Sequence, residues 1–191
     1  MTDKELIKAI KNNDQQAFKH FVEKNQQLVV NTCYGFLHNI ADAEDVAQDV
    51  FIEIFLSINK FREDAKLSTW LYRIAVNKSL NHIRDNKKHK ILNSIDNNSD
   101  ADKKFEKELP DENNSQPEKI IEDKERAQIL HSSINALPKN QKIAFTLSKY
   151  DDLSYKQIAE IMDFSLSSVE SLIHRAKKNL QKKLITFYKK K

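Results

Sequence analysis

Carboxylates gather on one side of a predicted helix, residues 43–59, and this chemistry suits a basic partner surface. Ile52 lies among them, and an apolar residue ringed by carboxylates fits a protein that presents Arg or Lys around a small apolar contact. A solvated face would carry the same charges. The opposite side, at 100° per residue, is predicted to be core: Val46, Ala47, Val50, Phe51, Ile54, Phe55 and Ile58. The predicted partner-binding side consists of Asp45, Gln48, Asp49, Ile52 and Glu53.

A second helical segment, about residues 69–88, carries chemistry for nucleic acid. Arg and Lys can hold phosphates, and amide side chains can bond base edges. The preceding loop has Phe61 and Trp70 at its ends, where an aromatic ring could stack on an unpaired base, although Trp70 alone is more often a core residue. The predicted nucleic-acid residues are Arg62, Lys66, Trp70, Arg73, Asn77, Asn81, Arg84 and Lys88.

A third segment, residues 151–180, has the pattern of a helix-turn-helix. A capping box at 154–157 opens a short helix, Asp163 and Phe164 form the turn, and Ser165 caps the second helix. An ordinary αα-hairpin would show the same spacing. The predicted buried side of the second helix is Leu166, Val169, Ile173, Ala176 and Leu180. Its exposed side, suited to the major groove, is Ser167, Ser168, Glu170, Ser171, His174, Arg175 and Lys178.

Composition predicts that all of these segments belong to an all-α fold. The chain has 191 residues but only 1 Gly and 3 Pro, which disfavours β-hairpins and Gly-rich phosphate loops. The net charge of +4 is too small to prove an acidic partner by itself, so the placement of charge decides. No apolar run approaches the roughly 18 residues of a membrane span. We expect a cytoplasmic protein without membrane insertion.

The predicted architecture is two small helical domains joined by a flexible acidic linker. Residues 1–92 form a helical bundle, 93–114 the linker and 115–191 the helix-turn-helix domain. Acids outnumber bases in the linker, which has few large apolar groups to offset its ordering entropy. Helices are expected at roughly 3–12, 14–38, 43–59 and 69–88. We expect the two domains to move freely relative to each other in the isolated protein.

Catalytic chemistry is the least supported class. The histidines are scattered, and the sequence has neither an HExxH motif nor Cys-His metal spacing. Cys33 stands in an apolar context and is predicted to be a small core residue. We therefore expect no enzyme activity, no metal and no cofactor.

These three segments, in this order, resemble the sigma-70 family of bacterial transcription initiation factors, in particular its small extracytoplasmic-function (ECF) group. The family's polymerase-docking helix is similar to DAEDVAQDVFIEIF, its minus-10 segment to FREDAKLSTWLYRIAVNKSLNHIR, and its minus-35 domain to residues 137–180. The resemblance spans nearly the whole chain. It implies a dissociable RNA polymerase subunit that supplies promoter recognition and strand opening, with core RNA polymerase, promoter DNA and an anti-sigma factor as partners.

The resemblance also implies roles for individual positions. Asp45, Gln48, Asp49 and Ile52 match positions that meet the clamp helices of the polymerase's largest subunit, and the loop 62–67 matches the part that captures a flipped base. Trp70, Arg73, Asn77, Asn81 and Arg84 match the region around the melted element.

The chain departs from the family pattern at several positions. Asp152 and Asp163 stand where the family often has Gly, and Asp visits left-handed conformations more readily than most residues. Asn81 replaces a common Asp. Glu170 and Leu172 replace common basic residues of the recognition helix, which suggests a distinct promoter sequence.

Two other functions stay open at this point. A helix-turn-helix regulator would bind duplex DNA without polymerase, usually as a dimer, and would leave the acidic side of 43–59 unexplained. A helical interaction protein would leave both basic faces without a role.

Overall fold

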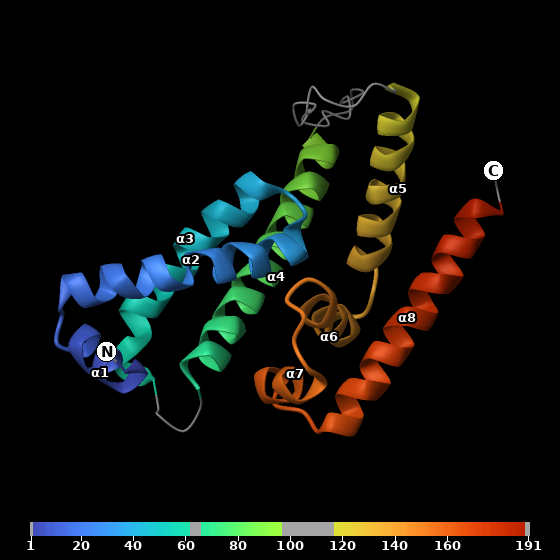
Figure 1. The fold of residues 1–191 in the computed structure, drawn as a ribbon. Coiled ribbons are helices and arrows are strands. Elements are labelled where there is room, and N and C mark those ends of the chain that lie inside the picture. The colour runs from blue at the N-terminus through green and yellow to red at the C-terminus, as the bar shows by residue number, and fades with distance from the viewer. Residues whose placement is uncertain (1, 62–65, 97–116, 190–191) are drawn as a thin grey trace.

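The computed structural model describes residues 2–61, 66–96 and 117–189, and those ranges contain helices and no strand (Figure 1). The all-α prediction is therefore confirmed. No described helix is long and apolar enough to cross a membrane. The elements are α1 (Asp3–Lys11), α2 (Gln15–Leu37), α3 (Ile40–Ser57), the short 3-10 turn η1 (Ile58–Lys60), α4 (Leu67–Asp96), α5 (Pro117–Asn135), α6 (Lys139–Lys149), α7 (Tyr155–Met162) and α8 (Leu166–Tyr188).

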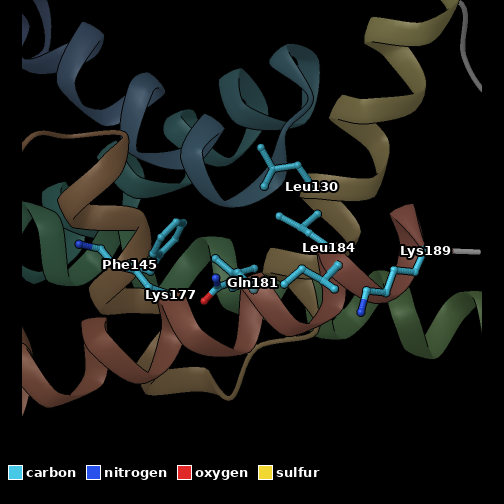
Figure 2. A pocket seen from close by; sticks show the side chains of 8 residues that line it. Leu130, Phe145, Lys177, Gln181, Leu184 and Lys189 are labelled. Carbon is cyan, nitrogen blue, oxygen red and sulfur yellow. The ribbon is translucent and has the colours of Figure 1, made fainter.

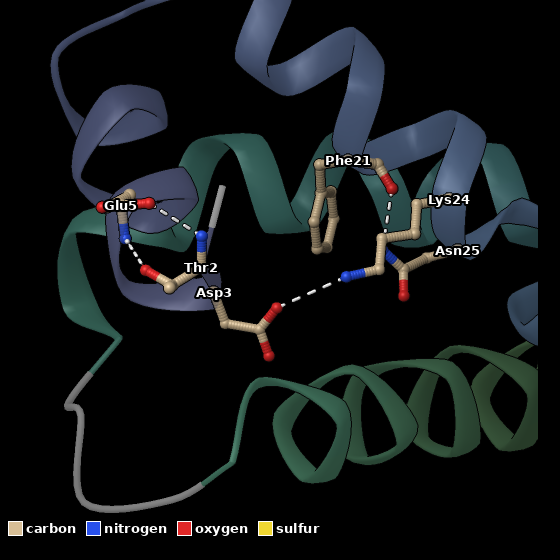
Figure 3. Close-up of polar contacts among 6 residues, drawn as sticks. All are labelled: Thr2, Asp3, Glu5, Phe21, Lys24 and Asn25. Atoms are coloured by element: carbon tan, nitrogen blue, oxygen red, sulfur yellow. Dashed lines mark hydrogen bonds and ion pairs between the residues drawn. The ribbon is translucent and has the colours of Figure 1, made fainter.

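Side-chain caps explain where the first helices begin. The Thr2 backbone N–H donates to Glu5 Oε2 at 2.8 Å, and the Glu5 N–H donates to Thr2 Oγ1 at 3.3 Å, which closes a capping box (Figure 3). Asp14 Oδ1 accepts from the amides of residues 16 and 17 and so starts α2. An ion pair of 3.5 Å between Asp3 and Lys24 ties α1 to α2. The predicted starts of both helices are confirmed.

The N-terminal half, α1–α4, has its own core. Phe21, Val29, Val50, Ile54 and Leu71 are fully buried there, and Cys33 joins them as predicted. The apolar side predicted for residues 43–59 is buried with one exception, described next.

The prediction that Phe55 is core is wrong, because its side chain is 45% exposed. Phe55 lies at the margin of the apolar side of α3. Its ring packs edge-on against Phe18, with 5.0 Å between centroids, and leaves its outer face open.

The C-terminal half, α5–α8, contains the predicted helix-turn-helix in α7 and α8. Ser154 and Gln157 form the capping box, and Ser165 Oγ accepts from the Ser168 N–H at 3.2 Å. Asp152 and Asp163 have φ of 49° and 57°, the left-handed conformation for which the family often uses Gly. These local predictions are confirmed.

Leu166 is the error in this half: it was predicted to be buried, and it is 49% exposed. It is the first residue of α8, and a helical side chain leans toward the helix N-terminus. A side chain at this position has no preceding helical turn beside it to cover it, which agrees with its exposure. Leu172, one of the departures from the family pattern, is buried.

The two halves pack against each other, which the sequence did not predict. We call their contact the seam: Phe36, Tyr72 and Val76 of α2 and α4 share one apolar cluster with residues of α6 and α7, namely Ile143, Leu147, Ile158 and Ile161. In Figure 1, α4 (green) runs between the other N-terminal helices and α6–α7. The described residues of the two halves thus share a core, and the expectation of free relative motion in the isolated protein stays a prediction.

Most of the predicted linker lies outside the described residues, which stop at 96 and resume at 117. Helix α4 extends to Asp96, beyond the predicted end near residue 88, and α5 begins at Pro117. The division into 1–92, 93–114 and 115–191 stays a prediction.

Candidate polymerase and nucleic-acid interfaces

The outer side of α3 carries an apolar ridge between acids. Asp45, Gln48 and Asp49 are exposed, Ile52 is 57% exposed, and Leu56 is 71% exposed. Sequence reasoning missed Leu56, although it follows Ile52 by four residues and so lies on the same helical face. Two neighbouring aliphatic side chains beside two carboxylates can bury apolar area against a partner while attracting its cations.

Glu53 differs from the other acids predicted on this side. Its carboxylate lies 3.4 Å from Lys78 Nζ of α4 and is half-buried. It therefore links α3 to α4, and the open acidic surface consists of Asp45 and Asp49 with the amide of Gln48.

The basic face of α4 is exposed over much of its length. Asn77, Asn81, Arg84 and Lys88 are all accessible, and so is Lys66 just before the helix. Their spacing places the amides and cations of α4 on one stripe, as predicted. Arg62 lies outside the described residues.

Arg84 forms an ion pair with the adjacent Asp85. Its Nε donates to Asp85 Oδ1 at 3.0 Å, and this hydrogen bond is the main cause that lowers the pKa of Asp85. The pair is exposed, so the arginine can exchange this partner for a phosphate at little cost.

Trp70 is partly buried, in keeping with the core alternative. Its ring packs against Phe61 with 4.9 Å between centroids, and it contacts the N-terminal core. The two rings predicted to flank the loop therefore touch each other across it.

Arg73 is the predicted nucleic-acid residue that the structure places elsewhere. Its Nε donates to the carbonyl oxygen of Ile161 at 2.9 Å, and its Nη2 donates to that of Glu160 at 2.7 Å. Both carbonyls belong to the last turn of α7, where a helix leaves carbonyl groups without intrahelical partners. Arg73 therefore closes the seam in this arrangement.

The recognition side of α8 is open to solvent. Ser167, Ser168, Glu170, Ser171, His174, Arg175 and Lys178 are all exposed. Ser165 Oγ lies 2.7 Å from Ser168 Oγ, and Arg175 Nε donates to the Ser171 carbonyl at 3.2 Å. Because Ser165 and Ser168 make the helix cap, the carboxylate of Glu170 is not needed for it.

Two hollows join the predicted nucleic-acid faces of the two halves. One, of about 300 Å³, is lined by Arg73 and Asn77 of α4 together with Asn140 and Phe164. The other, of about 700 Å³, runs along α8 past Ser171 and includes the same Asn140 and Phe164. The hollow beside the α4 stripe and the hollow beside the recognition side of α8 therefore share a wall that includes Asn140 and Phe164.

An apolar groove between α5, α6 and α8 was also missed by sequence reasoning. It has a volume of about 540 Å³, and Figure 2 shows Leu130, Phe145 and Leu184 directed into it, with Lys177 and Lys189 at its margins. The signal was available in the apolar residues of α8 beyond Leu180. Such a groove can accept the apolar face of a helix.

Comparison with known proteins gives two consecutive family matches. Residues 21–89 match the family described as "Sigma-70 region 2", and residues 127–180 match the family described as "Sigma-70, region 4". The first match covers α3 and most of α4, and the second covers α6, α7 and the first part of α8.

Full-length relatives agree with these matches. The chain is 32% identical to the ECF RNA polymerase sigma factor SigW of Bacillus subtilis, over 96% of this chain and 97% of the relative. It is 32% identical to the ECF RNA polymerase sigma-E factor of Escherichia coli K12, over 96% and 95%. The RNA polymerase sigma-H factor of Pseudomonas aeruginosa is 31% identical, over 95% and 93%.

Solved structures share the fold. CnrH, solved in complex with the cytosolic domain of CnrY, superposes with a TM-score of 0.64 at 21% identity, over 96% of this chain and 97% of that one. The sigma factor RpoE of Bartonella quintana, solved with the anti-sigma factor NepR, has a TM-score of 0.57 at 20% identity, over 87% and 96%.

Proposed function

The chain belongs to the sigma-70 family of RNA polymerase sigma factors, in its extracytoplasmic-function group. From this premise we propose which step of transcription initiation each of its exposed faces carries out. As a sigma factor it binds core RNA polymerase and directs promoter recognition and DNA melting. Sigma factors as a class are not enzymes, and we extend this to the chain: its faces bind and position, without catalysis. The site of action is the cytoplasm.

The outer side of α3 binds core polymerase. Its exposed ridge of Ile52 and Leu56 would lose water on docking, and Asp45 and Asp49 would face basic groups of the polymerase. The single observation that supports this role best is the ridge itself, because a helix that only covers a core has no need of two large aliphatic side chains on its solvent side.

The exposed stripe of α4 holds the opened minus-10 strand. Asn77 and Asn81 can bond base edges, while Arg84 and Lys88 can hold the backbone phosphates. Base flipping costs a few kcal/mol, and stacking on the flipped base together with hydrogen bonds to its edge must offset this cost. The loop with Arg62 and Lys66 adjoins this stripe in sequence.

The N-terminal part of α8 reads the minus-35 element. Ser167, Ser168 and Ser171 are short enough to let the helix approach base edges, and Arg175 and Lys178 lie one to two turns later where phosphates would be. Glu170 can accept from the amino group of cytosine, and its charge repels phosphates, so it contributes selectivity more than affinity.

An anti-sigma factor is the proposed regulator. The structural relatives of the same fold were solved with the cytosolic domain of CnrY and with the anti-sigma factor NepR, and we carry this class of partner to the chain as a proposal.

The experiment that tests the proposed function measures core-polymerase binding. The double variant Asp49→Arg with Ile52→Ala should weaken the affinity of the chain for core polymerase by at least tenfold, about 1.4 kcal/mol, without unfolding it, since neither side chain is buried. Glu23→Arg, a charge reversal at an exposed acid of α2, is the matched control. Equal affinity of the double variant and the control in a fluorescence titration would reject the docking assignment.

A further inference from the structure

The apolar groove between α5, α6 and α8 has no role in the functions assigned above. Its volume of about 540 Å³ lies within the range of small-molecule sites in proteins. Leu180 is buried where it lines the groove, in a small apolar cluster with Ile134 of α5. Leu130 is 36% exposed and Ile185 is 44% exposed, so water reaches much of the apolar wall. The apolar lining consists of Leu130, Phe145, Leu180, Leu184 and Ile185.

Lysines mark the two ends of this groove. Figure 2 shows Lys177 and Lys189 at its opposite margins, with the polar side chain of Gln181 between them. The two lysines are twelve residues apart in sequence, which corresponds to about 18 Å along a helix. Both are exposed, and neither forms an ion pair within the described residues. The sequence from 171 to 189 contains no Asp or Glu, so no acid of this part of α8 competes for their charges.

An elongated apolar groove with a cation at each end fits a long acyl chain that carries a negative head. The chain would lose water against the aliphatic lining, and the head would pair with one of the lysines. The apolar residues here line a hollow, whereas a helix that lies on a bilayer buries a projecting apolar face in it. The concave shape therefore favours a single dispersed amphiphile over a membrane surface.

The polarity of the lining separates this ligand from a partner helix. Protein interfaces carry roughly one hydrogen bond per 100–200 Å². Between its two lysines the groove offers a single polar side chain, Gln181. A hydrocarbon chain has no polar group to satisfy along its length, so it suits this lining better than a helix with polar margins.

We propose that the groove between α5, α6 and α8 binds a free long-chain carboxylate, with its hydrocarbon chain along the apolar lining and its carboxylate at one of the two end lysines. The residues of this site are distinct from those assigned to polymerase and DNA, so the proposal does not depend on those assignments. A bound chain would exclude the apolar face of a helix from the same groove, and the two kinds of ligand would compete.

The charge at the head is tested by displacing a dansyl-labelled undecanoate from the full chain, with competitors kept below micelle-forming concentrations. Dodecanoate and dodecanol share one chain and differ in the head, so the ratio of their affinities isolates the charge. We expect dodecanoate to bind up to about fivefold more tightly at low salt, as an exposed ion pair allows. Lys177→Gln with Lys189→Gln should bring this ratio to one. Lys182→Gln with Lys183→Gln, at exposed positions of α8 outside the lining, should keep it.

The length of the acyl chain tests the apolar lining. From octanoate to hexadecanoate the affinity should rise by at most about fourfold per added methylene, and it should stop rising when the chain fills the groove of about 18 Å. Ile185→Gln places a polar group in the lining and should weaken dodecanoate binding about tenfold. Ile40→Gln, at a similarly exposed position of α3, is the matched control and should have no effect.

Four results would overturn the proposal. They are equal affinities for dodecanoate and dodecanol, an affinity for dodecanoate that Ile185→Gln leaves unchanged, binding to phosphatidylglycerol vesicles but not to dispersed dodecanoate, and displacement of the probe by an acidic amphipathic peptide but not by dodecanoate. The last result would assign the groove to a protein partner. None of these readouts uses polymerase or DNA, so a failure of the proposed function would leave them unchanged.

Discussion

Asp151→Asn should give the seam a pH dependence that the unmodified protein nearly lacks. Asp151 accepts a hydrogen bond from Thr32, while its other oxygen, Oδ2, is buried and has no hydrogen-bond partner among the described residues. Burial raises the pKa of Asp151 from 3.8 to about 6; the Thr32 hydrogen bond opposes this shift, and Asp152 adds to it. The closed form therefore holds a proton that an open form releases, and the seam weakens as pH rises from about 4 to 6.

His38 acts with the opposite sign in the same pH range. Burial, then the stacked His131, then Lys142 lower the pKa of His38 from 6.5 to about 4, so the closed form keeps this ring neutral. An open form takes up the proton below its ordinary pKa, and the seam strengthens as pH rises from about 4 to 6.5. Lys142, whose pKa burial lowers to about 8, stays charged throughout.

The two effects are similar in size. The pKa of Asp151 goes from 3.8 to about 6 and that of His38 from 6.5 to about 4, and a change of this size would correspond to roughly 3 kcal/mol for a fully buried group. Both side chains are partly exposed, and solvent screening reduces each contribution to about 1–2 kcal/mol. In the unmodified chain they largely cancel, whereas Asp151→Asn leaves His38 alone and keeps an acceptor for Thr32.

The assay measures energy transfer from pH 4.5 to 7 between two dyes, one on Lys19→Cys of α2 and one on Lys183→Cys of α8. Both positions are exposed, and Cys33 is fully buried and stays unlabelled. The Asp151→Asn seam should be closed at pH 7 and should open by a factor of roughly ten in its closed-to-open ratio on acidification, as about 1.4 kcal/mol implies. Asp45→Asn is the matched control, since Asp45 is an exposed acid of α3 outside the apolar cluster of the seam. A flat profile for Asp151→Asn, or a steep one for the unmodified chain, would refute the reasoning.

Three further predictions concern the DNA faces. Arg84→Ala should reduce promoter melting, measured by permanganate reactivity, while core-polymerase affinity is retained; Asn86→Ala, on the other side of α4, should leave melting unchanged, and equal melting by both would reject the role of the stripe. In a promoter-library readout, Glu170→Gln should relax preference at one minus-35 base pair by about 1–3 kcal/mol, and unchanged preferences would show that Glu170 does not read sequence. Lys178→Ala should weaken binding to all sequences and reduce the salt slope by about 1, and loss of one base preference alone would contradict its phosphate role.

Local chemistry could be predicted from the sequence because it depends on near neighbours. The caps at Thr2, Ser154 and Ser165, and the left-handed turn at Asp163, are each determined within a few residues. Helical periodicity likewise separates Ile54 from the exposed side of α3. The same periodicity misassigns Phe55, because a residue at the margin of an apolar stripe is buried or exposed according to its neighbours in space.

The seam could not be predicted from such patterns. Arg73 fits the basic stripe of α4 by spacing, yet its partners are backbone carbonyls 87 and 88 residues away in the chain. Periodicity identifies a polar residue on a face but not what covers that face. One local signal was available: Gly35, a lone glycine inside a helical pattern, marks a close approach of another backbone.

The most direct test of the central claim is run-off transcription with purified core RNA polymerase on a library of genomic fragments. The account predicts that the chain, added to core polymerase, yields discrete transcripts whose start sites share minus-10 and minus-35 elements, and that Asp49→Arg with Ile52→Ala abolishes them. If the chain bound the same fragments tightly without polymerase and directed no transcript with it, the sigma-factor account would be contradicted.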